Sequence, residues 1–238
     1  KVLGINRRVQ GVWAKFAQWK NELCSRHYPL KDRLRLFSAV ITPTALFGSK
    51  AWVLNAERER KLRSTQRRML RLIAGVSRRT IQVDAQGSSE PLNMTSCSDD
   101  STNSKASGAS CSSTTEKEFQ ETTENYVEWI RRATRIVLGA LEKAGLEDWV
   151  TLQRRWKWRW AGHCARRTDG RWANEVLAWL PEQGRRNRGH PLKRWQDSVN
   201  GYLHYLYGAP ADSWMAYAGD RDEWCKLESQ FAEQDWSL

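Results

Sequence analysis

The chain has 238 residues, enough for one large domain or two small ones, and a net charge of +12 with an isoelectric point near 9.8. This excess of Lys and Arg indicates a polyanionic partner, with nucleic acid ahead of an anionic membrane. No apolar run approaches the roughly 18 residues that cross a bilayer, and the N-terminus has no secretory apolar core. Five scattered cysteines fit reduced thiols, which favours an intracellular setting, nuclear or cytoplasmic.

Fourteen tryptophans are unusual for this length, and with only five Phe and three Met they must form much of the core. Helical periodicity dominates the chain, and no strand-rich stretch is apparent. The sequence therefore predicts an all-α fold, with two small helical units joined by a disordered linker. The units are residues 1–83 and 126–238.

The linker is residues 84–125. This segment holds 16 Ser and Thr among 42 residues, and eight acidic residues against two Lys. Its few large apolar side chains cannot offset the entropy of ordering the segment, so we expect it to be disordered. Because the linker has a net negative charge, the net positive charge of the two flanks together is larger than that of the whole chain.

The first flank contains an amphipathic helix that Asn55 can cap and Gly75 can end. Leu62, Met69 and Ile73 fall on one face. The opposite side carries four arginines, Arg60, Arg63, Arg67 and Arg71. An earlier helix, with Leu30 to Ile41 as its apolar positions, should end or bend at Pro43.

The segment 58–79 holds nine Lys and Arg but a single acid. A solvated helix face normally mixes both signs. The run therefore predicts a surface that faces a polyanion, although an ordinary solvated face is the alternative.

The second flank contains RRWKWRWAGHCARR, residues 154–167, in which three tryptophans alternate with basic residues. Strict alternation is typical of a half-buried strand, but the wider window from Trp149 has helical spacing, which favours a helix. A helix buries Trp156 and Trp160 together and leaves Trp158 among arginines. For Trp158, core packing and stacking on a nucleic-acid base both stay open. Further helices are expected near residues 126–141, 172–180, 191–206 and 220–233.

Seven stretches, taken in order, resemble the C-terminal region of LINE-type, non-LTR retrotransposon reverse transcriptases. Upstream, VITPTALFGSKAWVL and LRSTQRRMLRLIAGVSRR are similar to the family's thumb region. Downstream, WRWAGHCARR, DGRW with WLP, RGHPLKRWQD and SWMAYAGDRDEWCKL are similar to the domain after the polymerase. The resemblance implies a thumb-like region at 1–83 and a Trp-rich, basic C-terminal domain at 126–238.

The chain departs from the family's pattern at several positions. Cys164, His190 and Ser198 replace the usual Val, Arg and second Asp, and Phe47 and Lys50 stand where Tyr and Glu are usual. These departures favour a decayed element relic as one alternative reading.

The resemblance implies an RNA-directed DNA polymerase as the parent protein, but this chain lacks the paired catalytic aspartates of the palm. The pair Asp99–Asp100 has no apolar strand beside it and is rejected as catalytic. Whether the chain itself belongs to an active enzyme is therefore left open. No cofactor is expected here, since Mg²⁺ would be held by the missing palm.

No metal site is expected either, because Cys24–His27 is a single pair and His163, Cys164 and His190 lack the spacing of zinc modules. Asp169, Glu175 and Asp197 are set aside as nuclease carboxylates for the same reason.

We hypothesise that the fragment binds template RNA or an RNA–DNA hybrid beside the rest of the parent polymerase, without membrane or small-molecule partners. A structural adaptor that docks an acidic protein is the alternative. The candidate nucleic-acid-binding residues are Arg60, Arg63, Arg67, Arg71, Arg78, Arg79, Arg154, Arg155, Lys157, Trp158, Arg159, Arg166, Arg167, Arg185, Arg186, Arg188, Lys193 and Arg194.

Overall fold

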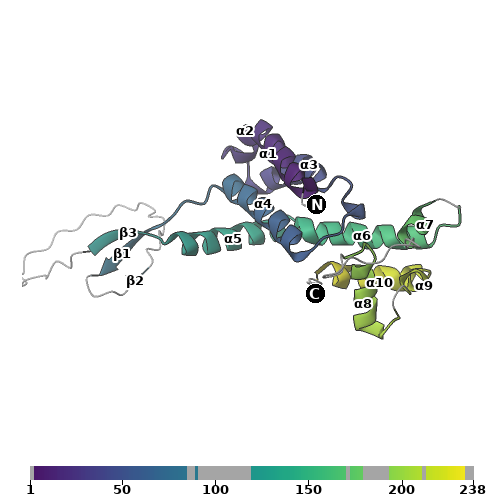
Figure 1. Cartoon of the computed structure of the whole chain (residues 1–238). Helices are drawn as coiled ribbons and strands as arrows, with labels where there is room; N and C mark the ends of the chain where they lie inside the picture. Colours follow the sequence, from purple (N-terminus) through teal and green to yellow (C-terminus); the bar gives the residue numbers. More distant parts are fainter. Residues whose placement is uncertain are drawn as a thin grey trace, which may run out of the picture. The chain divides into compact units, whose positions relative to one another are not determined.

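The computed structural model describes residues 3–84, 89–90, 119–169, 172–178, 193–210 and 213–233. Their contacts divide the chain into two units. Unit 1 joins Lys1–Gly75 with Val137–Leu238, and unit 2 is Val76–Ile136. The described residues are mostly helical, as predicted (Figure 1).

The helices, in chain order, are α1 (Leu3–Gln18), α2 (Lys20–Cys24), α3 (Leu30–Leu46), α4 (Ala56–Ala74), α5 (Tyr126–Lys143), α6 (Trp149–Ala165), α7 (Ala173–Ala178), α8 (Asp197–Tyr207), α9 (Trp214–Tyr217) and α10 (Arg221–Glu233). A short 3-10 turn, η1 (Ser49–Ala51), precedes α4. The helices expected at 126–141, 149–165 and 220–233 are confirmed. By contrast, α8 begins at Asp197, six residues after the proline at which a start was expected.

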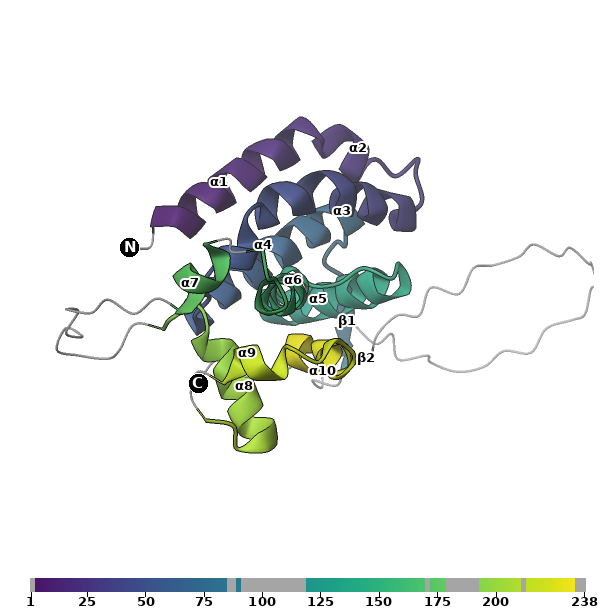
Figure 2. The same cartoon turned by 90° about the vertical axis from the view of Figure 1, so that its right-hand side faces the viewer.

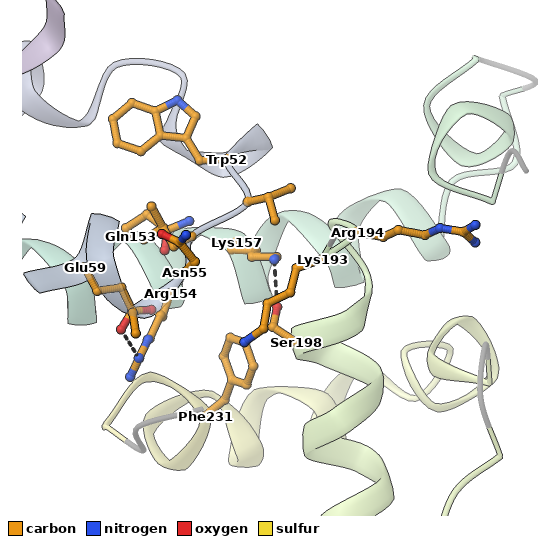
Figure 3. Close-up of a pocket in the computed structure, with 13 residues that line it drawn as sticks. Trp52, Asn55, Glu59, Gln153, Arg154, Lys157, Lys193, Arg194, Ser198 and Phe231 are labelled. Carbon is orange, nitrogen blue, oxygen red and sulfur yellow. Dashed lines mark hydrogen bonds and ion pairs between the residues drawn. The ribbon is translucent and has the colours of Figure 1, made fainter. Parts of the chain in front are cut away.

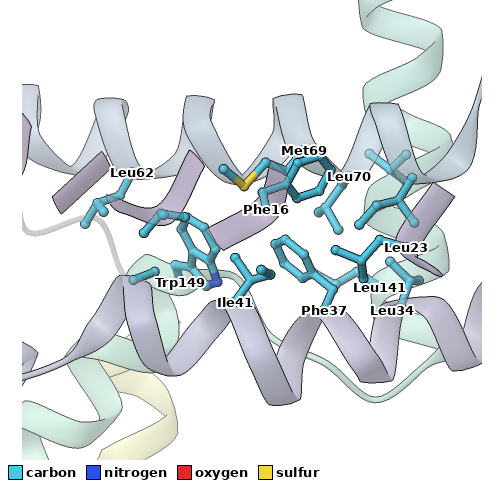
Figure 4. Close-up of a cluster of buried hydrophobic side chains, with 14 of the residues drawn as sticks. Phe16, Leu23, Leu34, Phe37, Ile41, Leu62, Met69, Leu70, Leu141 and Trp149 are labelled. Atoms are coloured by element: carbon cyan, nitrogen blue, oxygen red, sulfur yellow. The ribbon is translucent and has the colours of Figure 1, made fainter. Parts of the chain in front are cut away.

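The first core of unit 1 is built by helices from both ends of the chain (Figure 4). Apolar side chains of α1, α3 and α4 meet the C-terminal part of α5 and the start of α6. Phe37 stacks on Trp149 with ring centroids 5.7 Å apart. The Trp149 indole N–H donates to the Thr42 hydroxyl at 2.9 Å, and its backbone N–H donates to Gln66 Oε1 at 2.9 Å.

This shared core differs from the expected division into residues 1–83 and 126–238. The first flank does not enclose its apolar faces alone, because the Phe37 ring of α3 is covered by Trp149 of the second flank. Lys1–Gly75 and Val137–Leu238 therefore form one unit with a common core, whereas residues 76–83 and 126–136 belong to unit 2.

Local sequence signals account for the bounds of α4. Asn55 Oδ1 accepts the Arg58 backbone N–H at 3.0 Å, and Gly75 ends the helix at φ 62°. Both agree with the expected capping. The helix does not end at Pro43, which was one of the two outcomes expected there, because α3 runs through it to Leu46. Ala45 and Leu46 are fully buried beyond the proline, so tertiary packing holds a turn that proline disfavours.

Unit 2 contains a small antiparallel sheet in the order β2-β1-β3. Its strands are β1 (Thr80–Asp84), β2 (Ser89–Glu90) and β3 (Phe119–Thr123). The end of β1, β2 and β3 fall within the predicted linker 84–125, where disorder was expected. Thr and Val in the paired strands have high β propensity, and pairing satisfies the backbone groups. Residues 85–88 and 91–118 of that linker lie outside the described residues.

A buried carboxylate ties the strand end to α5 inside unit 2. Glu124 pairs with Arg132 at 2.6 Å and accepts the Arg79 backbone N–H at 3.1 Å. The hydrogen bond from Arg132 is the main reason that the pKa of Glu124 falls to about 2. The Trp129 indole N–H donates to the Val76 carbonyl at 3.0 Å.

The second core of unit 1 is made by the C-terminal half of α6 with α8, α9 and α10, which group together in Figure 2. Its rings include Trp158, Tyr202, Trp214, Trp224 and Phe231, all nearly inaccessible to solvent.

No helix in the described part of the chain is long and apolar enough to cross a membrane.

Candidate nucleic-acid interface

The basic side of α4 has the predicted register. Leu62, Met69 and Ile73 are buried, while Arg60 is exposed. Arg63, Arg67 and Arg71 are half-buried at the edges of that face. Arg63 Nε lies 3.5 Å from Asp148 Oδ2, so one of the four arginines already has a protein carboxylate beside it.

Glu59, the single acid of the basic segment 58–79, is buried. Glu59 pairs with Arg154 of α6 at 2.6 Å, and both side chains are at most one tenth exposed. Because this carboxylate is buried, it adds little negative charge to the solvent face of α4. Arg154 is therefore a buried residue that joins α4 to α6, and its guanidinium has a carboxylate of the chain as its partner.

Trp158 is also buried, and this corrects its inclusion among the base-stacking candidates. Its ring lies parallel to that of Trp224, at 3.8 Å between centroids and 7° between planes. Tyr202 and Phe231 close on its remaining sides. The side chain has no exposed area, so it offers no face to a base.

The expected burial of Trp156 and Trp160 is not met either, since both are only partly buried. The physical reason is that α6 is covered on two sides. Its first half packs against the first core, and Trp158 with Ala161 packs against the second core. A single apolar stripe, on which the sequence argument rested, describes a helix with one buried face.

Most of the other basic side chains of α6 and of the two residues directly after it are held by partners within the protein. Arg155 Nη2 lies 2.6 Å from Glu147, and Arg159 pairs with Glu228 at 2.7 Å. Arg166 donates to the Ala218 carbonyl at 2.7 Å. Arg167 Nε lies 3.7 Å from Asp169. Of these, only Arg159 is well exposed, with 61% of its side chain accessible.

Lys157 is a buried cation, with 5% of its surface exposed. Its ammonium donates to Ser198 Oγ at 2.7 Å and lies 4.8 Å from the centre of the Trp195 ring. Burial away from water lowers the pKa of Lys157 to about 7, although Asp197 and Glu59 partly oppose this effect.

The remaining candidates fall in three places. Arg78 donates to the Glu124 carbonyl at 2.9 Å through Nε, and Arg79 is exposed, both within unit 2. Lys193 and Arg194 are half-buried just before α8. Arg185, Arg186 and Arg188 lie outside the described residues.

Sequence reasoning missed the two most exposed rings among the described residues. Trp172 is 76% exposed, and Phe47 is 72% exposed with the Arg8 guanidinium 5.6 Å from its ring centre. Trp172 directly precedes the six-residue helix α7 and follows Gly170 in DGRW, a turn-forming context that signals exposure better than the helical position of Trp158 does.

Among the residues that the structure describes, no three His, Cys, Asp or Glu side chains gather in a way that would hold a metal ion. The candidate surface is therefore defined by cations and rings. In unit 1 its best-exposed members are Arg60, Arg159, Phe47 and Trp172.

No protein-family model matches the chain, and no solved structure does. The chain is similar to a Caenorhabditis elegans protein described as uncharacterized and transposon-derived, with 25% identity over 222 residues. The match covers 92% of this chain and 62% of the relative, so the chain spans less than two thirds of that protein's length. This similarity supports an origin in a transposable element.

Proposed function

We propose that the chain is the C-terminal part of a retrotransposon RNA-directed DNA polymerase, in which it binds template RNA or an RNA–DNA hybrid without the catalytic palm. The transposon-derived relative supports the element origin. The basic run of α4 supports a polyanionic partner.

The observation that carries the proposal is where the family-like motifs lie. Trp160, Trp195 and Trp214 come from three separate motif stretches and form a chain of edge-on ring contacts, at 5.2 and 5.9 Å between centroids. Gly162 lies against Trp224 of the last stretch. Motif residues that are distant in sequence thus assemble in one place, which is expected if the motifs maintain a common fold.

In this proposal the exposed arginines neutralise phosphates and fix the position of the strand, whereas rings supply base stacking. Arg60 and Arg159 extend into solvent and can reach phosphates. Trp172 and Phe47 replace Trp158 as stacking residues, because they present most of their ring surface to solvent.

The test measures the affinity of the protein for single-stranded RNA and for an RNA–DNA hybrid over a series of salt concentrations. We expect affinity to fall with salt, with a slope of roughly −0.7 per phosphate contact on single strands. Trp172→Ala should weaken binding without lowering the melting temperature. An affinity that hardly changes with salt would contradict the proposal.

One observation favours a second candidate, a structural adaptor domain. Arg154, Arg155 and Arg159 all pair with carboxylates of the chain itself, so much of the positive charge of α6 serves internal contacts. The same salt titration distinguishes the two candidate functions. An adaptor would bind acidic protein segments, and its affinity for RNA would be no greater than that of an unrelated basic protein.

A further inference from the structure

A recess in unit 1 collects cations from three separate segments (Figure 3). Its walls come from residues 52–59, from α6 and from residues 193–198, with Phe231 of α10 at one side. Arg154, Lys157, Lys193 and Arg194 all line it. Asp197, although nearby, is exposed and accepts the Arg194 backbone N–H at 2.6 Å.

The positive charge of the recess is only partly compensated. Among the described residues that line the recess, Glu59 is the one carboxylate, and Arg154 pairs with it. Within the described residues no carboxylate lies at ion-pair distance from Lys157, which contacts a neutral hydroxyl and an aromatic face instead. Figure 3 shows the Lys157 ammonium directed at Ser198, while Arg194 extends away from that pair.

A buried ammonium with no carboxylate at ion-pair distance is costly, because water no longer solvates it. An anion that enters the recess would regain much of this energy, since attraction between opposite charges is stronger away from bulk water. Ser198 adds a donor at the same point, because a hydroxyl that accepts from Lys157 can still donate its own proton.

We propose that this recess binds one phosphate group of a nucleic-acid strand, with Lys157 and Ser198 as the inner contacts and Lys193 at the rim. Phosphate fits these groups because it is compact and has several acceptor oxygens, and lysine acts on it as a point charge. The inference rests on the proposed function for the source of the phosphate, but the recess itself can be probed with inorganic phosphate.

The first experiment compares thermal melting in inorganic phosphate and in chloride at equal ionic strength. Wild-type protein should melt a few degrees higher in phosphate, by linkage of binding to folding. Lys157→Met and Ser198→Ala should lose most of that increment. The control Lys20→Met removes the same charge from an exposed position of α2 and should keep it, which also corrects for general salting effects.

The second experiment measures RNA affinity against salt for the same variants. Lys157→Met should make the salt slope shallower by about one contact, roughly 0.7 on single strands. Inorganic phosphate should displace RNA from the wild-type protein more effectively than from the Lys157→Met variant.

The outcomes separate the two claims. RNA binding with an unchanged slope in Lys157→Met, together with no phosphate increment in the wild type, would overturn the recess and leave the proposed function standing. Absent RNA binding with a phosphate increment that Lys157→Met abolishes would overturn the proposed function and the strand as the source, while supporting the recess as a phosphate site. An equal increment from glutamate would show that carboxylates fit as well, and would overturn the choice of phosphate.

Discussion

Trp158 and Trp224 exchange hydrogen bonds across the second core. The Trp158 indole N–H donates to the Trp224 carbonyl at 2.8 Å, and the Trp224 indole N–H donates to the Trp158 carbonyl at 3.0 Å. The two rings lie parallel between these bonds. The pair therefore joins α6 to α10 through apolar contact and through both polar handles of the rings.

Replacing Trp158 with Ala should lower the free energy of unfolding by about 3–5 kcal/mol, because a large buried ring and its hydrogen bond are both lost. Trp172→Ala is the matched control, since that ring is 76% exposed, and should change stability by less than about 0.5 kcal/mol. Chemical denaturation of both variants checks this. Similar losses in the two would show that Trp158 is not a core residue.

Gly162→Ala should destabilise the protein although alanine favours helices. A Cβ at Gly162 would lie 2.6 Å from Trp224 Nε1 and 2.7 Å from its Cδ1, so the stacked rings would have to shift. Overpacking of this kind costs about 1–3 kcal/mol. The control is Gly201→Ala in α8, where a Cβ meets nothing within 4 Å and should stabilise by up to about 1 kcal/mol. The expected result is opposite signs in denaturation experiments.

Glu59→Gln should cost about 3–5 kcal/mol, because it leaves the buried Arg154 guanidinium without its carboxylate. Glu223→Gln, which breaks the exposed pair with Lys226, should cost less than about 0.5 kcal/mol. A double-mutant cycle with Arg154→Met measures the coupling energy directly. A coupling near zero would mean that the buried pair does not join α4 to α6.

Stability should depend on pH through Lys157. Its folded-state pKa is about 7 against an ordinary 10.5, so between these values the unfolded chain holds more protons than the folded one. Wild-type stability relative to Lys157→Met should therefore rise over that range, by up to about 1.4 kcal/mol per pH unit, and stay flat below it. The charged neighbours Asp197, Glu59, Arg154 and Lys193 are present in both proteins and drop out of the comparison. If the difference in stability between the wild type and Lys157→Met did not change with pH, the ammonium would be solvated by water.

Local features of the fold could be predicted from sequence. The Asn55 cap, the end of α4 at Gly75 and the buried face of α4 each depend on a few neighbouring residues. The role of Trp158 could not, because it depends on which helix covers which side of α6. Ala161 and Gly162, small residues next to the rings, were the available signal that this second side is closely packed.

The recess at the candidate site could likewise not be predicted from the spacing of residues along one helix. The basic character of α6 is evident in the sequence, and charge counts alone suggested a solvent-facing surface. Whether Lys157 is solvated or enclosed is decided by Ser198 and Trp195, which lie some forty residues later in the chain. Spacing arguments along one helix do not reach such partners.

The first core also has a consequence for how the chain is made. During synthesis, Phe37 leaves the ribosome long before Trp149, the ring that covers it. The apolar face of the early helices therefore stays exposed until Trp149 has been made. Truncation before Trp149 should leave that face exposed and prone to aggregation.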